Sequence, residues 1–393
     1  MLKDIILLII GALLGYSYNI YKFTKKVWIK KIITSRKESM EKLDAYQWLI
    51  EYYKKNKSIN DLFDCKLGEL EVKLPFVTKP EWQFISPITN ITKDDILVYS
   101  ETVNNSFEIN RKLIEKRRAL GQELFDEPTL YLDRIEIKNG KLKLHTKKCR
   151  YFEMATNLFS LEEETIRSIN KKKETPIRDT YFADAGCCEK LLKKPFSLGC
   201  TTALVLKVGN SWEIVLHKRS ERTVTYGNKL AVIPNYGLTI PFRDCNTVNL
   251  LWYNFLKEYC EELYDYEEII KIANTNKNDP FWFYNLPENV ELMEMFRGNK
   301  SELYYLGFGF DLFNGTSNIA LAAIVYDENY VIKLKNNIKT NWEVKKDSDF
   351  NAAPLLFVDY KDKKLQEWLT GNEYQYGSAF TLAKTIDFLE NNY

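Results

Sequence analysis

Three glutamates near the end of one segment carry the clearest chemical signal in the sequence. Thr247–Glu262 reads TVNLLWYNFLKEYCEE, and its apolar residues recur every three or four positions, as on an amphipathic helix. At about 100° per residue, Glu258, Glu261 and Glu262 fall in one sector along the edge of that apolar stripe. Carboxylates grouped in this way suit Mg²⁺, which holds and polarises phosphates. A solvated acidic rim has the same pattern, so the helix alone leaves both interpretations open.

The other metal-binding residue types are scarce or badly spaced. The 393 residues include two histidines, His145 and His217, and seven cysteines without a CxxC pair. This composition argues against a zinc site or a disulfide framework. Any metal is therefore expected to be held mainly by carboxylates, which favours magnesium or manganese.

The same glutamates carry a family resemblance. Lys257–Glu262 (KEYCEE) resembles the core of the Nudix box, R-E-U-x-E-E, where U is a bulky apolar residue. Pro234–Gly237 (PNYG) stands where that family has Pro-Gly-Gly, and Lys218–Ser220 resembles the end of the preceding strand. The resemblance covers residues 195–330. It implies an α/β/α sandwich that binds nucleoside diphosphates linked to another moiety. It also implies that Glu258, Glu261 and Glu262 are the catalytic residues and bind magnesium.

The box departs from the family pattern at four positions. Asn249 stands where the pattern has its first Glu, Arg243 where it begins with Gly, and Tyr264 where it ends with Gly. Lys257 replaces the box Arg, which keeps the charge but loses a planar fork that orients a carboxylate. These departures predict a weakened or absent hydrolase that retains ligand binding.

Four further residues are predicted to contact a ligand. Arg219 and Arg222 can bind phosphates with their planar guanidinium groups, and they can equally be surface charges at a strand end. Tyr236 can stack on a base or simply pack in the core. Lys257 is the fourth, because it lies beside the glutamates.

The surrounding elements predict an α/β fold. Alternating apolar residues flank Asn139–Gly140 and Gly209–Ser211, which predicts two hairpins, and further apolar strands follow at 304–310 and 319–326. Ser160–Thr180 reads as a solvated helix followed by a linker at Pro176. We assign 65–180 to a small α+β module or N-terminal extension and 181–393 to the Nudix-like domain.

The N-terminus predicts a membrane anchor. Ile5–Tyr21 is uncharged and apolar, near the short end of the about 17–25 residues that span a bilayer. A cleaved signal peptide and a core helix are the alternatives. Seven Lys and Arg residues between 22 and 37 predict a single-pass anchor, residues 1–22, in the inner (cell) membrane with the C-terminal part in the cytoplasm. Residues 23–64 are expected to contain an amphipathic juxtamembrane helix suited to self-association, and hence a homo-oligomer.

An anchor joined to a Nudix-like domain resembles the transmembrane Nudix effectors of bacterial cyclic-nucleotide antiphage signalling (CBASS). That resemblance implies a membrane effector in antiphage defence that binds a cyclic nucleotide. The alternatives are a membrane-tethered, Mg²⁺-dependent Nudix hydrolase of a nucleoside diphosphate derivative and a membrane scaffold without a small ligand. The net charge of +2 gives no reason to expect nucleic-acid binding.

Overall fold

The computed structural model describes most of the chain from residue 44 onward. The described residues are 17, 20–21, 23–24, 27, 44–55, 62–89, 96–100, 107–120, 122, 124–171, 173–182, 190–192, 194–220, 223, 225–241, 248–266, 281–341, 343–344 and 355–393.

A large mixed sheet forms the centre of the molecule. Its strands follow the order β1-β2-β11-β12-β7-β8-β13, while β3, β9 and β10 pair with β11, β8 and β7. Only the pairing of β12 with β7 is parallel in this sheet. The strands are β1 (Leu62–Leu67), β2 (Leu70–Val77), β3 (Ser86–Pro87), β7 (Leu198–Val208), β8 (Ser211–Lys218), β9 (Leu230–Val232), β10 (Asn235–Gly237), β11 (Ser301–Asp311), β12 (Ser317–Val325) and β13 (Leu355–Asp359).

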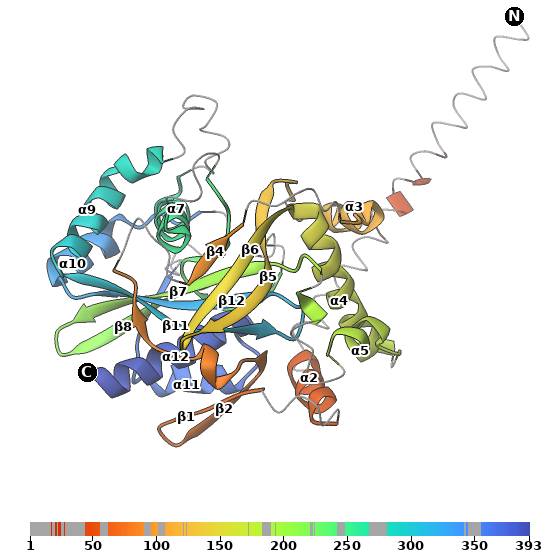
Figure 1. Ribbon diagram of the computed structural model, residues 1–393, viewed down its shortest axis with the longest axis horizontal. Helices are drawn as coiled ribbons and strands as arrows, with labels where there is room; N and C mark the ends of the chain where they lie inside the picture. The colour runs from red at the N-terminus through yellow and green to blue at the C-terminus, as the bar shows by residue number, and fades with distance from the viewer. Residues whose placement is uncertain are drawn as a thin grey trace, which may run out of the picture.

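Helices cover both faces of this sheet. The helices are α2 (Asp44–Lys55), α3 (Arg111–Ala119), α4 (Tyr151–Lys171), α5 (Pro176–Phe182), α7 (Leu250–Tyr264), α9 (Pro287–Arg297), α10 (Glu328–Asn337), α11 (Lys363–Thr370) and α12 (Tyr376–Asn392), with 3-10 turns at Pro80–Trp82 and Trp282–Asn285. Figure 1 shows α7 on one side of the sheet and α11 and α12 on the other. The expected α/β/α layering is therefore present.

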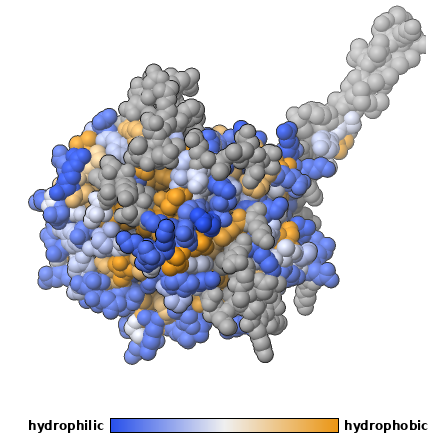
Figure 2. All heavy atoms as spheres, in the orientation of Figure 1, coloured by the Kyte–Doolittle hydropathy of each residue, from blue (hydrophilic) through white to orange (hydrophobic). Residues whose placement is uncertain are grey.

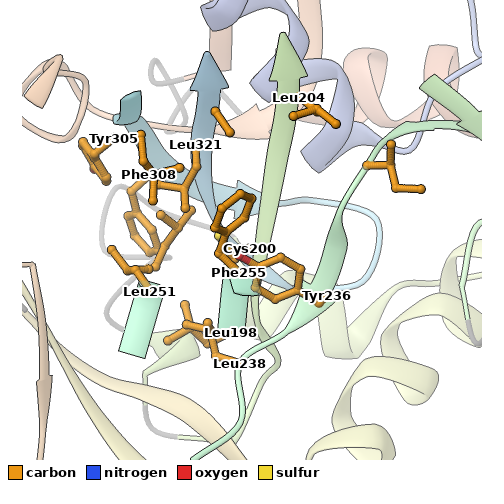
Figure 3. Close-up of a cluster of buried hydrophobic side chains, with 14 of the residues drawn as sticks. Leu198, Cys200, Leu204, Tyr236, Leu238, Leu251, Phe255, Tyr305, Phe308 and Leu321 are labelled. Carbon is orange, nitrogen blue, oxygen red and sulfur yellow. The ribbon is translucent and has the colours of Figure 1, made fainter. Parts of the chain in front are cut away.

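Two apolar cores explain the layers. Along β7, Leu204 and Leu206 belong to the core under α7, whereas Ala203 and Val205 belong to the core under α12. Successive side chains of a strand point to opposite faces, so a strand covered on both faces is apolar throughout. All nine residues of β12 are buried, and from Ile319 onward they are apolar without interruption. Figure 3 shows part of the α7-side core, where Leu251 lies near Leu198 and Leu238.

A second, smaller sheet contains β4 (Leu97–Tyr99), β6 (Lys141–Arg150) and β5 (Pro128–Lys138), in that order. The β5–β6 turn has Asn139 and Gly140 at φ of 52° and 73°, as the sequence predicted for an Asn-Gly hairpin. Leu130, Leu132 and Leu144 from this sheet join the α7-side core. Residues on both sides of position 180 thus contribute to one core.

Two expectations about helices are corrected. Residues 160–180 do not form a solvated helix and a linker: Leu161 and Glu162 are fully buried in α4, and Pro176 begins α5, in which Arg178 is fully buried. A stretch with many charges reads as solvated when the burial of its partners is unknown. The amphipathic helix expected within 23–64 corresponds to α2, and residues from Leu62 onward belong to β1 instead.

The predicted anchor lies almost entirely outside the described residues. Among the residues that are described, no helix combines the length and the apolar character needed to cross a bilayer. Figure 2 shows hydrophilic side chains over much of the visible face of the molecule, with smaller groups of apolar side chains between them. Most large apolar side chains of the described chain belong to the two cores.

Candidate functional site

Helix α7 holds the three glutamates, and polar side chains fix it in place. The Asn249 side chain caps its first turn by accepting from the amides of Leu251 and Trp252, at 3.0 and 3.2 Å. Asn254, fully buried, exchanges hydrogen bonds with both backbone groups of Thr239, each at 2.9 Å. These contacts attach the helix to the chain that follows β10, so the glutamates have a defined position over the sheet.

Lys257 neutralises two of the three glutamates. Its Nζ donates to Glu258 Oε1 at 2.8 Å and to Glu261 Oε2 at 3.2 Å. Burial alone would lower the pKa of Lys257, but the two carboxylates outweigh burial and hold that pKa well above its usual value. Lys257 is therefore a charged residue that pairs with two glutamates of its own helix, and its contact with a ligand stays a prediction.

Glu262 lies in a different environment. Its side chain is 1% exposed, and Oε1 accepts from the Asn235 amide at 3.0 Å. Oε2 is buried and has no hydrogen-bond partner among the described residues. Burial raises the pKa of Glu262 well above its usual value, and the charges of Glu343 and Glu258 raise it further. The Asn235 amide and Arg219 lower it, but not enough to reverse the shift. Neutralising this carboxylate requires a proton or an additional cation.

The charge of Arg219 lowers the pKa of Glu262, so these two side chains interact electrostatically. Arg219 is 7% exposed, and its Nε donates to the Thr225 carbonyl at 3.4 Å, a long hydrogen bond. Nη2 lies 4.0 Å from Glu343 Oε2, at the limit of an ion pair, and Nη1 is buried without a partner in the described chain. A guanidinium with an unused donor can bind an oxyanion such as a phosphate.

The structure brings some predicted residues together and separates others. Arg219 and Glu262 interact electrostatically, whereas Glu258 and Glu261 pair with Lys257. Tyr236 packs in the α7-side core, where Figure 3 shows it among buried side chains, and its hydroxyl lies 3.4 Å from Thr202 Oγ1. Arg222 lies outside the described residues.

Three residues of this site were not predicted. Asn235 lies within the PNYG motif, so its position in that motif could have indicated that it belongs to the site. Glu343 comes from a stretch without apolar periodicity, and only the fold brings it to Arg219. His217 is fully buried, two residues before Arg219, and neither ring nitrogen has a partner within the described part of the chain. Burial, with the charge of Arg219, lowers the pKa of His217 to about 3, so the ring is neutral.

The fit to a metal ion is partial. No group of three or more His, Cys, Asp and Glu side chains in the described ranges is arranged to hold a metal. That Glu258, Glu261 and Glu262 bind Mg²⁺ together stays a prediction. Mg²⁺ usually keeps several waters and binds one or two carboxylates together with substrate phosphates. Glu262, with an unused oxygen near Glu343, fits an ion that arrives with a phosphate ligand.

Comparisons with known proteins match solved structures only. No family model matches the sequence, and no curated protein matches it. Among solved structures, the chain is similar to a C. elegans Ap4A hydrolase crystallised as a binary complex, at 11% sequence identity and a TM-score of 0.24. The match covers 50% of this chain and 99% of the hydrolase. Similarity at this level establishes neither a common fold nor a common activity.

Proposed function

We propose that this chain is a nucleotide-binding protein with a Nudix-like domain, in which Arg219 contacts the phosphates of the ligand and Glu262 contacts the Mg²⁺ ion that these phosphates carry. One observation carries the proposal. Glu262 Oε2 and Arg219 Nη1 are buried atoms without partners in the described chain, and they belong to side chains that interact electrostatically. Buried polar atoms are almost always hydrogen-bonded. An unpaired donor on Arg219 and an unpaired acceptor on Glu262 therefore support a ligand that supplies oxygens to the arginine and a cation to the glutamate.

The pairing of Lys257 supports binding in preference to turnover. A Mg²⁺ ion held by Glu258 and Glu261 would have to compete with the ammonium group that already bridges them. We therefore propose that the ligand is bound as a signal and remains intact. The finer proposal is an effector of cyclic-nucleotide antiphage defence, anchored by residues 1–22 in the inner membrane with its C-terminal part in the cytoplasm. Its apolar N-terminal run and the basic residues after it support this topology. Self-association is proposed to follow binding.

Calorimetry with the full chain in detergent tests the binding proposal. The panel contains ADP, ADP-ribose, diadenosine tetraphosphate, and cyclic di- and trinucleotides, each with and without Mg²⁺. We expect at least one of them to bind, to be recovered intact by chromatography, and to bind at least tenfold more weakly to Arg219→Met. Lys218→Met, which removes an exposed neighbouring charge, is the control. A panel without any binding partner would favour the scaffold alternative.

Fractionation tests the anchor separately. The full chain is expected in the membrane fraction after carbonate washing, and a chain that begins at residue 38 in the supernatant. If both versions are recovered in the supernatant, the anchor is wrong.

A hydrolase is the second candidate, and Glu262 favours it. Burial and neighbouring acids raise the pKa of Glu262 well above its usual value, and a carboxyl shifted in this direction suits a general acid or base. On this alternative, a member of the panel is consumed when Mg²⁺ is present and Glu262→Gln abolishes turnover while binding persists. Recovery of intact ligand after prolonged incubation of the wild-type protein excludes this candidate for that ligand.

A further inference from the structure

A fully buried arginine joins three parts of the molecule. Arg178 is fully buried, and its Nη1 donates to the Tyr53 hydroxyl of α2 at 2.7 Å and to the Leu312 carbonyl. Its Nη2 donates to Thr165 Oγ1 of α4 and, at 3.0 Å, to the Phe313 carbonyl. The two carbonyls belong to the turn between β11 and β12. One guanidinium therefore attaches this turn to α2, the first well-described helix after the N-terminal region.

The same turn continues into a buried acid. Asp311, 2% exposed, ends β11, and its Oδ1 accepts from the Phe313 amide at 2.8 Å. Its Oδ2 accepts from the Tyr226 hydroxyl at 2.6 Å. The Tyr226 ring also contacts Phe313 and Tyr376, with ring centroids 5.4 Å apart in both pairs. Tyr226 is thus fixed at both its ring and its hydroxyl.

Tyr226 in turn follows Thr225, whose carbonyl accepts a hydrogen bond from Arg219 Nε. Backbone bonds close the segment between β8 and β9, because Arg219 N donates to Lys229 O at 2.9 Å and Asn228 N donates to Arg219 O at 3.0 Å. Tyr226 has a φ of 55°, a left-handed conformation that a tyrosine adopts only when its surroundings impose it.

We propose that Arg178, Asp311 and Tyr226 are positioning residues, which direct Arg219 toward the ligand and couple its segment to α2. This inference rests on the proposed function, since it assigns Arg219 a ligand. The network supplies the link that an effector needs between a ligand site and its N-terminal region: α2 contacts Arg178, Arg178 holds the 312–313 carbonyls, Asp311 holds Tyr226, and Tyr226 places the Thr225 carbonyl.

The energetics support a function beyond packing. A buried charge is costly unless it is fully hydrogen-bonded, and replacing such groups by apolar residues is often neutral or stabilising. Arg178 and Asp311 interact through their charges, since the Arg178 charge lowers the pKa of Asp311. What both side chains share is that they fix backbone: two carbonyls for Arg178 and one amide for Asp311. Fixed backbone at a ligand site is what pre-organisation requires.

A double-mutant cycle tests the proposal on the full chain. Tyr226→Phe and Tyr53→Phe each delete one hydroxyl, and each is measured alone and together with Arg219→Met. The probes are pyrophosphate with Mg²⁺ and the tightest-binding nucleotide of the panel above. Tyr305→Phe is the matched control, because its buried hydroxyl donates to the Trp82 carbonyl at 2.7 Å outside this network.

We expect Tyr226→Phe to weaken binding about fivefold, the loss of one hydrogen bond, and Tyr53→Phe to weaken it two- to threefold. In the Arg219→Met protein neither substitution should weaken binding further, because both act through Arg219. Tyr305→Phe should lower thermal stability to a similar extent without changing affinity. Additive effects in the Arg219→Met background, or an equal effect of Tyr305→Phe, would overturn the proposal.

Hydrogen exchange separates this inference from the proposed function. The amides of Arg219, Asn228 and Lys229 should exchange faster in Tyr226→Phe than in Tyr305→Phe, with no ligand present. Wild-type protein that binds no probe, combined with this exchange result, refutes the ligand site but leaves the positioning of Arg219 intact. Unchanged exchange refutes the positioning, whether or not a nucleotide binds.

Discussion

The glutamates of α7 lie in two environments, which differ in the group that balances the carboxylate charge. Glu258 and Glu261 share the Lys257 ammonium, so their charges are balanced within one helix. Glu262, the next residue along, is buried against Asn235 and interacts with Glu343 and Arg219 without a hydrogen bond to either. Neighbouring residues of one sequence motif can therefore have different electrostatic environments.

On the proposed function, this difference separates carboxylates that stabilise the fold from a carboxylate that faces a ligand. A carboxylate whose cation is supplied by its own helix contributes to stability. Removing that cation should therefore lower mainly the free energy of unfolding. A carboxylate buried beside other acids has an unfavourable charge that a ligand or a proton relieves. Substitutions at paired groups are therefore expected to change mainly the free energy of unfolding, and substitutions at Glu262 to change the response to a ligand as well.

The largest effect is expected at Lys257. Lys257→Met leaves Glu258 and Glu261, whose side chains are 12% and 8% exposed, without their shared cation. Removing one partner of a buried ion pair costs about 3–5 kcal/mol, and urea unfolding should show a loss near that range. Lys257→Arg keeps the charge and should lose less. A loss below about 1 kcal/mol, as for an exposed pair, would show that the cluster is not a stabilising one.

The second prediction concerns Asp311, a buried carboxylate from another element. Burial raises its pKa to about 7, against about 3.9 in an unfolded chain. The folded state therefore holds the proton more tightly, and its stabilising contribution, full below pH 4, is lost as pH rises to 7. We expect the free energy of unfolding to fall by up to about 4 kcal/mol over this window. The difference between wild type and Asp311→Asn isolates this group, and a difference independent of pH would contradict the prediction.

Local patterns predicted the elements better than the site. The β5–β6 and β7–β8 hairpins and α7 follow from turn residues and apolar periodicity, and the structure contains each of them. Apolar runs such as that of β12 indicate a strand covered on both faces. By contrast, residues 160–180 were read as solvated because their charges are visible in the sequence, while the partners that bury Arg178 are not.

The site depends on contacts between distant parts of the chain. Glu343 meets Arg219 through an isolated bridge between Val344 and Arg219, a pairing that no local pattern encodes. The spacing of the glutamates correctly placed them on one helix, but spacing does not show which of them Lys257 would neutralise. The tertiary position of Asn235 is what distinguishes Glu262.

The third prediction applies the same reasoning to Glu262. Because burial raises its folded-state pKa, ionising Glu262 costs stability as pH rises above the unfolded value. Glu262→Gln should therefore be more stable than wild type near pH 8, and the advantage should shrink toward pH 4. Mg²⁺ with a bound nucleotide should raise the melting temperature of the wild type more than that of the variant. Equal stability of the two proteins at every pH would show that the charge of Glu262 is compensated, as the charges of Glu258 and Glu261 are by Lys257.

The smallest effect is expected at an exposed pair, which sets the baseline for the comparison. Lys333 Nζ lies 2.7 Å from Glu291 Oε2, and the two side chains are 57% and 31% exposed. Water and salt screen such a pair, so Lys333→Ala should cost less than about 1 kcal/mol in urea unfolding. The remaining cost should disappear in 1 M NaCl, where screening is strong. The Lys257→Met loss should persist in the same salt, since burial and not ionic attraction across solvent sets its size. If salt removes both losses alike, the distinction between the paired glutamates of α7 and an ordinary surface pair fails.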